Sequence, residues 1–237
     1  MFMKFGIKTF GDRKFVKYFE KKADFLEIMA INGRDYSFLR SFPKPIIIHA
    51  EHQKFGINYA DRSNILESVN SIRLAISLAN KFKSEKIITH LGMLTEKTHS
   101  VINAVSLIRY FKDERIFIEN LPSRGNYIGT TPEEMKVIFK ETGARFCLDI
   151  NHAISAAMTL KRDPFEMLNQ FINMNPKHYH IGGQNSETDE CHLSFRDSNI
   201  DLGRIIKMIP ENAEITLETT TDIRKIEEDI ETIRSLF

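Results

Sequence analysis

The sequence has few cysteines, no long apolar run and almost no net charge, so it lacks the features of a secreted disulfide-rich protein, a membrane protein or a strongly basic nucleic-acid-binding protein. Its 237 residues include no tryptophan and only two cysteines, Cys147 and Cys191. So few thiols exclude a disulfide-stapled scaffold and favour a reducing compartment. No stretch approaches the roughly 18 consecutive apolar residues of a membrane-spanning helix. The formal net charge is only +1, so any contact with DNA needs a local patch rather than overall charge. We expect a cytoplasmic protein that does not bind membranes.

What the sequence does contain is a repeated pattern of short β-prone runs, each ending in a residue that can bind a metal ion. The clearest run is Phe146-Cys147-Leu148-Asp149, with His152 three residues later. The other runs are Ile46-Ile47-Ile48-His49, Ile87-Ile88-Thr89-His90, Ile116-Phe117-Ile118-Glu119, His178-Tyr179-His180, Ile215-Thr216-Leu217-Glu218 and, less clearly, Phe25-Leu26-Glu27. Strands whose C-terminal ends meet at one polar site are typical of a (β/α)8 barrel.

The order of the predicted elements supports the same fold. Strand signals alternate with helix signals along the whole chain, which favours one closed parallel barrel over two domains. We therefore predict an α/β protein, a single TIM barrel over residues 1–237. An open doubly wound sheet would need a Gly-rich first turn, and Phe10-Gly11-Asp12-Arg13 is a poor match. The predicted strands are Phe5–Thr9, Ala23–Met29, Ile46–Ala50, Lys86–Leu91, Arg115–Glu119, Arg145–Asp149, Lys177–Ile181 and Glu214–Glu218; the last predicted helix is Thr221–Phe237.

Histidines and carboxylates gather at the predicted strand ends. Imidazole and carboxylate together suit zinc, manganese or iron. The set is too large for one tetrahedral ion, which predicts a cluster of two or three ions with one bridging carboxylate. We expect His52, His99 and His178 to be surface or supporting groups rather than ligands. The candidate ligands are His49, His90, Glu119, Asp149, His152, His180, Glu190, His192 and Glu218.

These motifs resemble a known family. The run Cys147-Leu148-Asp149-Ile150-Asn151-His152-Ala153 is similar to the strand-six signature of endonuclease IV, the family 2 AP endonucleases, within the xylose isomerase-like TIM barrels. Glu119-Asn120, His90 and Leu217-Glu218-Thr219 match further strand ends of that family. Glu190-Cys191-His192 aligns with an aspartate-x-histidine motif in the loop after strand seven. The chain departs from the family at Asn151, and at His52, which takes the place of a tyrosine.

The resemblance implies three metal sites that share one carboxylate. His49, His90 and Glu119 would hold one ion, and Glu119 would bridge to a second ion held by Asp149, His180 and Glu218. His152, Glu190 and His192 would hold a third, with Glu190 standing where the family has an aspartate. The implied cofactor is zinc, two to three ions, with manganese possible.

The resemblance also implies an activity. A metal cluster of this kind neutralises a phosphodiester, generates hydroxide and stabilises the leaving alkoxide. The expected reaction is cleavage of DNA 5′ to an abasic site, with Glu119 bridging the ions and Glu218 closest to the nucleophile. We expect basic groups at the barrel rim to contact DNA phosphates. The candidate substrate-binding residues are Arg34, His52, Lys54 and Arg196.

A different class of enzyme in the same superfamily remains open. A sugar isomerase or epimerase needs one divalent ion, which Glu119, Asp149, His180 and Glu218 could hold, and its partner would be a small sugar. Glu119 and Glu218 would then act as general acid and base beside a carbonyl. That alternative leaves five candidate ligands without a joint role: His49, His90, His152, Glu190 and His192. A barrel that binds metal but has lost activity is also compatible with the ligands.

Overall fold

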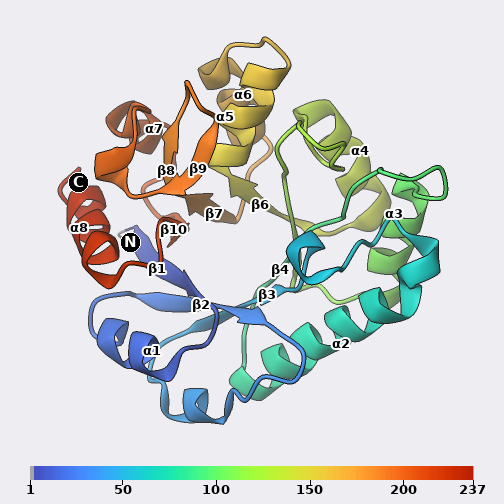
Figure 1. Cartoon of the computed structure of the whole chain (residues 1–237), viewed down its shortest axis with the longest axis horizontal. Helices are drawn as coiled ribbons and strands as arrows, with labels where there is room; N and C mark the ends of the chain where they lie inside the picture. Colours follow the sequence, from blue (N-terminus) through green and yellow to red (C-terminus); the bar gives the residue numbers. More distant parts are fainter. Residues whose placement is uncertain (1–2, 237) are drawn as a thin grey trace.

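The chain forms one closed barrel of eight parallel strands, shown from residue 3 to residue 236 in this computed structural model (Figure 1). Hydrogen bonds link the strands in the order β1-β10-β7-β6-β5-β4-β3-β2, and β2 closes the ring onto β1. The single (β/α)8 barrel predicted from the sequence is therefore confirmed. The barrel strands are β1 (Lys4–Thr9), β2 (Phe25–Ala30), β3 (Ile46–Ala50), β4 (Ile87–Thr89), β5 (Ile116–Glu119), β6 (Arg145–Asp149), β7 (His178–Ile181) and β10 (Glu214–Leu217).

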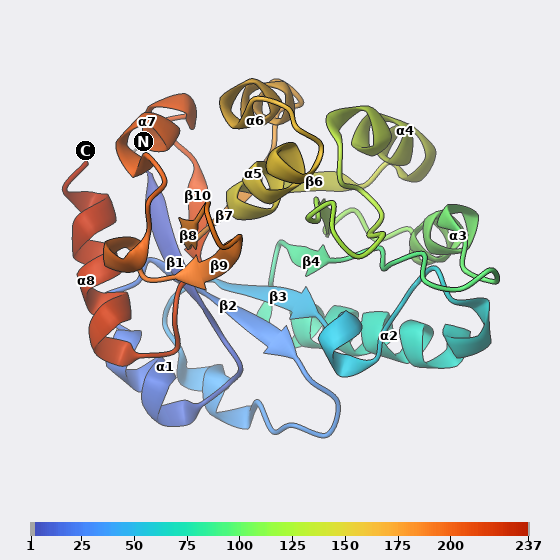
Figure 2. The ribbon, with the colours of Figure 1, turned by 45° about the horizontal axis from the view of Figure 1, so that its top comes forward.

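Helices surround this ring of strands (Figure 2). Their ends follow local chemistry: α4 begins where the Thr131 hydroxyl accepts from the backbone N–H of Glu134, with Pro132 in the first turn. It ends at Gly143, which adopts the left-handed conformation (φ +68°) that glycine tolerates. The described helices are α1 (Arg13–Phe19), α2 (Ile65–Phe82), α3 (Val101–Phe111), α4 (Pro132–Thr142), α5 (Ile150–Thr159), α6 (Pro164–Ile172), α7 (Leu202–Met208) and α8 (Ile223–Arg234). The predicted end of the last helix, Phe237, lies outside the described residues.

One pair of strands was not predicted. Strands β8 (Gly183–Asn185) and β9 (Glu190–Leu193) form an antiparallel hairpin after β7, where the sequence suggested only a loop. The hairpin is separate from the barrel and packs near the short 3-10 helix Phe195–Asp197. Its position beside the C-terminal ends of β7 and β10 brings Glu190 and His192 to the mouth of the barrel.

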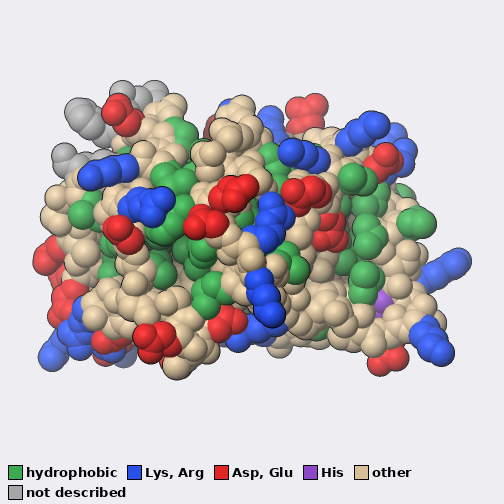
Figure 3. All heavy atoms as spheres, turned by 90° about the horizontal axis from the view of Figure 1, so that it is seen from above, with side chains coloured by type: hydrophobic (Ala, Val, Ile, Leu, Met, Phe, Trp, Pro, Cys, Tyr) green, Lys and Arg blue, Asp and Glu red, His purple; other side chains and the backbone are tan. Residues whose placement is uncertain are grey.

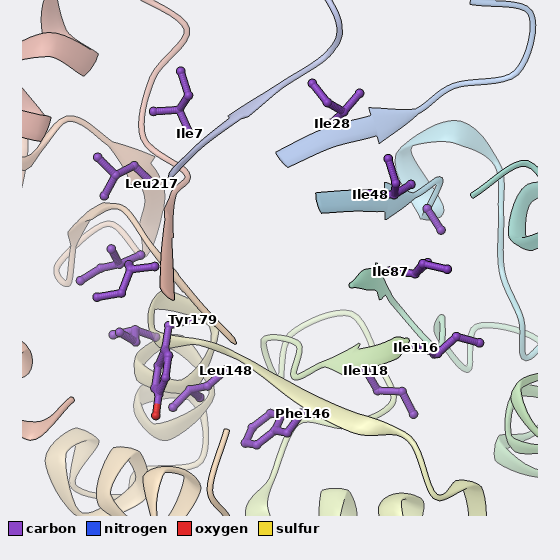
Figure 4. Close-up of a cluster of buried hydrophobic side chains, with 14 of the residues drawn as sticks. Ile7, Ile28, Ile48, Ile87, Ile116, Ile118, Phe146, Leu148, Tyr179 and Leu217 are labelled. Atoms are coloured by element: carbon purple, nitrogen blue, oxygen red, sulfur yellow. The ribbon is translucent and has the colours of Figure 1, made fainter. Parts of the chain in front are cut away.

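Alternate residues of each strand point outward and bury their side chains beneath the helices. Figure 4 shows this apolar layer around the ring, including Ile7, Ile28, Ile48, Ile116 and Leu148. Each of these side chains is at most 2% exposed. Burial of aliphatic side chains contributes roughly 1.5–3 kcal/mol each, so this layer supplies much of the driving force for the fold.

The inward-facing residues form distinct layers along the barrel axis. A small apolar cluster of Phe25, Ile47, Ile88, Phe117 and Cys147 fills the middle. At Gly6 an added Cβ would lie 2.1 Å from the Phe25 ring, so the ring fits there only because this position has no side chain. Below the apolar cluster the ammonium of Lys86 pairs with Glu214 at 2.7 Å. Above it, polar and charged side chains occupy the inward positions toward the C-terminal ends, and these include Glu27, His49 and Glu119.

The surface of the molecule carries both signs of charge. On the side that faces upward in Figure 1, the Lys and Arg side chains are interspersed with Asp and Glu (Figure 3). Along the part of the chain that the structure describes, every helix is too short or too polar to cross a membrane.

Candidate metal centre

The predicted ligands come together at the C-terminal ends of the strands, around a cavity of about 890 Å³. The position follows from the fold, because parallel strands of a closed barrel all end on one face. His90, Glu119, His152, His192 and Glu218 line the cavity. The buried ligands His49, Asp149 and His180 lie immediately behind them, each with 0% exposure.

Glu119 is the centre of the arrangement. Its Oε2 atom lies 3.2 Å from His49 Nε2, 3.1 Å from His90 Nε2 and 3.4 Å from His180 Nδ1. Its Oε1 atom lies 3.2 Å from His152 Nδ1. Imidazoles delivered by β3, β7, the end of β4 and the start of α5 thus surround one carboxylate that is 1% exposed. A residue in this position could bridge two ions.

Asp149 joins strand β6 to helix α5. Its Oδ1 accepts from the backbone N–H of His152 at 2.7 Å and caps the helix. The other oxygen, Oδ2, lies 3.5 Å from His152 Nδ1. The cap places the His152 imidazole over Glu119, so the spacing of three residues noticed in the sequence has a direct structural cause.

Two asparagines fix the backbone that carries these ligands. Asn120 donates from Nδ2 to the Asp149 carbonyl at 2.9 Å and accepts from the Asp149 N–H at 2.8 Å. Asn151 repeats the arrangement with Gly182: it donates to the carbonyl at 3.0 Å and accepts from the N–H at 2.6 Å. Each side chain links one strand end to the next around the ring. The sequence marked Asn151 only as a departure from the family, and this role was missed.

A buried ionic layer lies directly beneath the ligands. Glu27 accepts at Oε2 from Thr216 Oγ1 at 2.7 Å and contacts His180 Nε2 at 2.9 Å and His178 Nε2 at 3.3 Å. His178 is buried rather than at the surface, and its ligand atom lies within 4.8 Å of those of Glu27 and His180. Lys8, which was not singled out, pairs with Glu218 at 2.5 Å. The sequence does place Lys8 next to the C-terminal end of the first strand, where the other site residues lie on their own strands, and that position could have identified it.

The remaining candidates lie in different places. His192 donates from Nδ1 to the Glu218 carbonyl oxygen, 3.0 Å away, and adopts an uncommon left-handed backbone (φ +62°). Glu190 lines the cavity, but its side chain is exposed on β9. Of the candidate substrate-binding residues, His52 and Lys54 line the cavity; the described lining does not include Arg34 or Arg196. Arg196 pairs with Glu228 at 2.9 Å instead. The His52 ring stacks on His90, with 4.7 Å between centroids.

Burial and neighbouring charges shift the pKa values of the groups in the centre in opposite directions. Burial opposes ionisation of Glu119, but the neighbouring His90 and His180 outweigh it and hold the pKa of Glu119 well below its usual value. Burial raises the pKa of Asp149. Burial also lowers the pKa of His90 to about 4. At His152 burial is outweighed by Asp149 and Glu119, and the pKa rises to about 9. Strong shifts of this kind are typical of functional sites.

The donor set fits a divalent metal. Within the described residues, Glu119 Oε1, Asp149 Oδ2 and His180 Nδ1 are buried without a hydrogen-bond partner. Nearby groups approach these atoms, as Glu218 Oε1 does at 2.8 Å from His180 Nδ1, but without hydrogen-bond geometry. Buried unpaired polar atoms are costly. Ligand atoms of His49, His90 and Glu119 lie within 4.8 Å of one another, as do those of Glu119, Asp149 and His152. Nitrogen and carboxylate ligands suit zinc or manganese.

Comparisons with known proteins agree with this architecture. Endonuclease IV from Thermus thermophilus has a TM-score of 0.74 at 18% identity and covers 98% of each chain. A D-tagatose 3-epimerase-like protein has a TM-score of 0.71 at 21% identity, covering 98% of this chain and 99% of the other. These likenesses show the fold.

A curated relative, an uncharacterized protein of Methanocaldococcus jannaschii, is 26% identical over 184 residues. The alignment includes 70% of this chain and spans 60% of the relative's length. The model of the family described as xylose isomerase-like TIM barrel matches residues 5–236. Because that match includes almost the whole sequence, the chain belongs to the xylose isomerase-like TIM barrel family.

Proposed function

We propose that this protein is a metal-dependent phosphodiesterase that cleaves DNA 5′ to abasic sites. The observation that carries the proposal is the ring of four imidazoles around Glu119, with contacts of 3.1–3.4 Å. A single tetrahedral ion cannot use so many ligands, whereas two or more ions bridged by Glu119 would use them all. The endonuclease IV neighbour supports the choice of reaction class.

The residues present would divide the work as follows. His49, His90 and Glu119 would hold one ion; Glu119, Asp149, His180 and Glu218 would hold a second; His152, Glu190 and His192 would hold a third. When bound, such ions supply Lewis acidity and an activated water. Glu218 lines the cavity and would accept a proton from the attacking water. His52 and Lys54 at the cavity wall would contact phosphate oxygens.

The direct test is cleavage of a labelled duplex with one abasic site, in zinc and in manganese. We expect a single nick 5′ to the site by the wild type and at least about a hundredfold loss in His90→Ala and Glu119→Gln, which remove an ion ligand and the bridge. Glu141→Gln on α4 serves as a control, since its exposed side chain pairs with the exposed Arg109 at 3.9 Å. A metal-loaded wild type that leaves the abasic duplex intact would refute the proposed substrate.

A sugar epimerase is the second candidate, and one observation favours it. His180 Nδ1 lies 3.4 Å from Glu119 and 2.8 Å from Glu218, so one ion could share these three ligands, and the two carboxylates would serve as acid and base beside a carbonyl. In that case His90→Ala would be tolerated far better than Glu119→Gln or Glu218→Gln. Incubation with a panel of ketohexoses, followed by chromatography of the products, separates the two candidates.

A further inference from the structure

Glu27 of β2 is completely buried beneath the ligands and contacts one of them, His180, from below. Its Oε2 atom lies 2.9 Å from His180 Nε2. The other ring nitrogen, Nδ1, lies 3.4 Å from Glu119 and 2.8 Å from Glu218. A ring turned over by half a rotation would present carbon atoms on both sides, so these contacts define one orientation. Resting on the metal centre of the proposed function, we propose that Glu27 is a positioning residue, which holds the His180 ring through Nε2 and directs Nδ1 at the ions.

The His180 ring is held in the opposite sense to the other candidate imidazole ligands. The other four contact an amide oxygen through Nδ1, which leaves Nε2 available to an ion. These contacts are His49 to the Ala50 carbonyl (2.7 Å), His90 to the Gln53 side chain (3.3 Å), His152 to the Asn120 carbonyl (2.9 Å) and His192 to the Glu218 carbonyl (3.0 Å). His180 alone among the five offers Nδ1, and its partner is a carboxylate, which is a stronger acceptor than an amide oxygen. A partner at the second nitrogen fixes both the tautomer and the direction of a metal-binding imidazole.

Hydrogen bonds that rise from the lower end of the barrel hold Glu27 in turn, and they begin at Lys86. An ammonium group can only donate. Lys86 Nζ lies 2.7 Å from Glu214 Oε2 and 2.9 Å from the Lys177 carbonyl oxygen. Its third contact is His178 Nδ1, at 3.3 Å. That nitrogen must therefore accept, and the proton of the neutral His178 ring is on Nε2.

The protonated Nε2 of His178 points toward Glu27. It lies 2.9 Å from Thr216 Oγ1 and 3.3 Å from Glu27 Oε2. The Thr216 hydroxyl donates its single proton to the same Glu27 oxygen at 2.7 Å. Every donor below Glu27 is thus directed at it, and the ionised carboxylate only accepts. Glu27 therefore accepts from His180 Nε2–H as well, and the lone pair of His180 Nδ1 is left for an ion.

Two substitutions remove this support without altering a ligand. Glu27→Gln keeps the shape of the side chain but replaces one acceptor oxygen with a donor. Thr216→Val keeps the shape of its side chain and removes the hydroxyl that contacts Glu27. Thr89→Val is the matched control: Thr89 is also a buried threonine of a barrel strand, at 2% exposure, but its hydroxyl donates to Tyr59 at 2.9 Å and does not contact the centre.

The experiment measures zinc affinity by competition with a chelator, and urea unfolding of each metal-free variant. Cadmium NMR of the cadmium-loaded proteins distinguishes the ions. We expect Glu27→Gln to weaken one ion at least about tenfold and to shift one cadmium resonance. Thr216→Val should weaken the same ion by a smaller factor, and it decides the result if Glu27→Gln fails to fold. Thr89→Val should lower stability and bind zinc as the wild type does.

Unchanged zinc affinity and cadmium spectra, with lower stability, in both Glu27→Gln and Thr216→Val would overturn the inference, because Glu27 would then only stabilise the fold. Nitrogen NMR of metal-free protein labelled at histidine gives a second test. His178, assigned with a His178→Asn variant, should carry its proton on Nε2, and a proton on Nδ1 would overturn the proposed direction of the hydrogen bonds.

These outcomes are separable from the proposed function. A zinc-loaded wild type that leaves abasic DNA intact would refute the phosphodiesterase, while the response of zinc binding to Glu27→Gln would still support or refute the role of Glu27. A wild type that binds no zinc would refute both.

Discussion

Replacing Asn151 by alanine should loosen the ring of ligands without touching a ligand. The Asn151 amide makes hydrogen bonds of 3.0 and 2.6 Å to the carbonyl and N–H of Gly182, and both residues are buried. Alanine would leave both backbone groups without a partner. Each buried unsatisfied group costs roughly 1–3 kcal/mol. Allowing for partial relaxation and entry of a water, we expect the free energy of unfolding to fall by about 2–4 kcal/mol.

The assay is urea unfolding of metal-free wild type and Asn151→Ala, followed by circular dichroism, with zinc content measured on the loaded proteins. We expect a lower midpoint at an unchanged slope, and a weaker hold on zinc because Gly182 follows the strand that carries His180. Asn169→Ala, at an exposed position of α6, is the control and should change stability by less than about 0.5 kcal/mol. Equal midpoints for Asn151→Ala and wild type would refute the reasoning about the two hydrogen bonds.

Two further predictions concern the lower end of the barrel and the cavity mouth. Lys86 and Lys4 outweigh the effect of burial and lower the pKa of Glu214 from 4.5 to about 2. The stability that this group contributes is therefore present above about pH 4.5 and lost as the pH falls toward 2. Glu214→Gln should cost about 1–2 kcal/mol at pH 7 after allowance for solvent screening, and urea unfolding should show the gap from wild type closing below pH 4.5; a gap independent of pH would contradict it. Phe10 lines the cavity and is 45% exposed, and the chain lacks tryptophan, so Phe10→Trp provides a unique fluorophore. Its emission should be quenched by an abasic oligonucleotide through base stacking, and unchanged emission at saturating oligonucleotide would argue against a base at this position.

The sequence was informative about strands and their ends for a physical reason. A strand buried in a barrel is a short run of β-branched and aliphatic residues, and a change to His, Asp or Glu marks its functional end. Ile46–Ala50 and Arg145–Asp149 were therefore predicted with the bounds that the structure shows. The same reasoning found His49, His90, Glu119, Asp149 and His180, because each lies at or next to the C-terminal end of a strand.

The sequence was less informative wherever function depends on a partner far along the chain. Lys8 resembles any polar residue of a first strand until β10 places Glu218 within 2.5 Å of it. Asn151 gains its role only from Gly182, which lies on the next strand connection. The hairpin of β8 and β9 has no long apolar run to signal it, and its register contains an irregularity at Gly183 and Gln184. Such features arise from tertiary contacts rather than from local propensity.

Metal binding and folding stability are linked in this centre, because its backbone groups are hydrogen-bonded whereas several of its ligand atoms are not. Asn120 and Asn151 satisfy the backbone around the ligands, so the ring holds its shape through the protein alone. Glu119 Oε1, Asp149 Oδ2 and His180 Nδ1 remain without hydrogen-bond partners among the described residues, and that deficit is a cost that a bound ion would remove. The backbone is therefore prepared in advance while the ligand atoms are left unsatisfied. A barrel built in this way favours a bound cation, and ion binding would stabilise the folded state by an amount that rises with ion concentration and affinity.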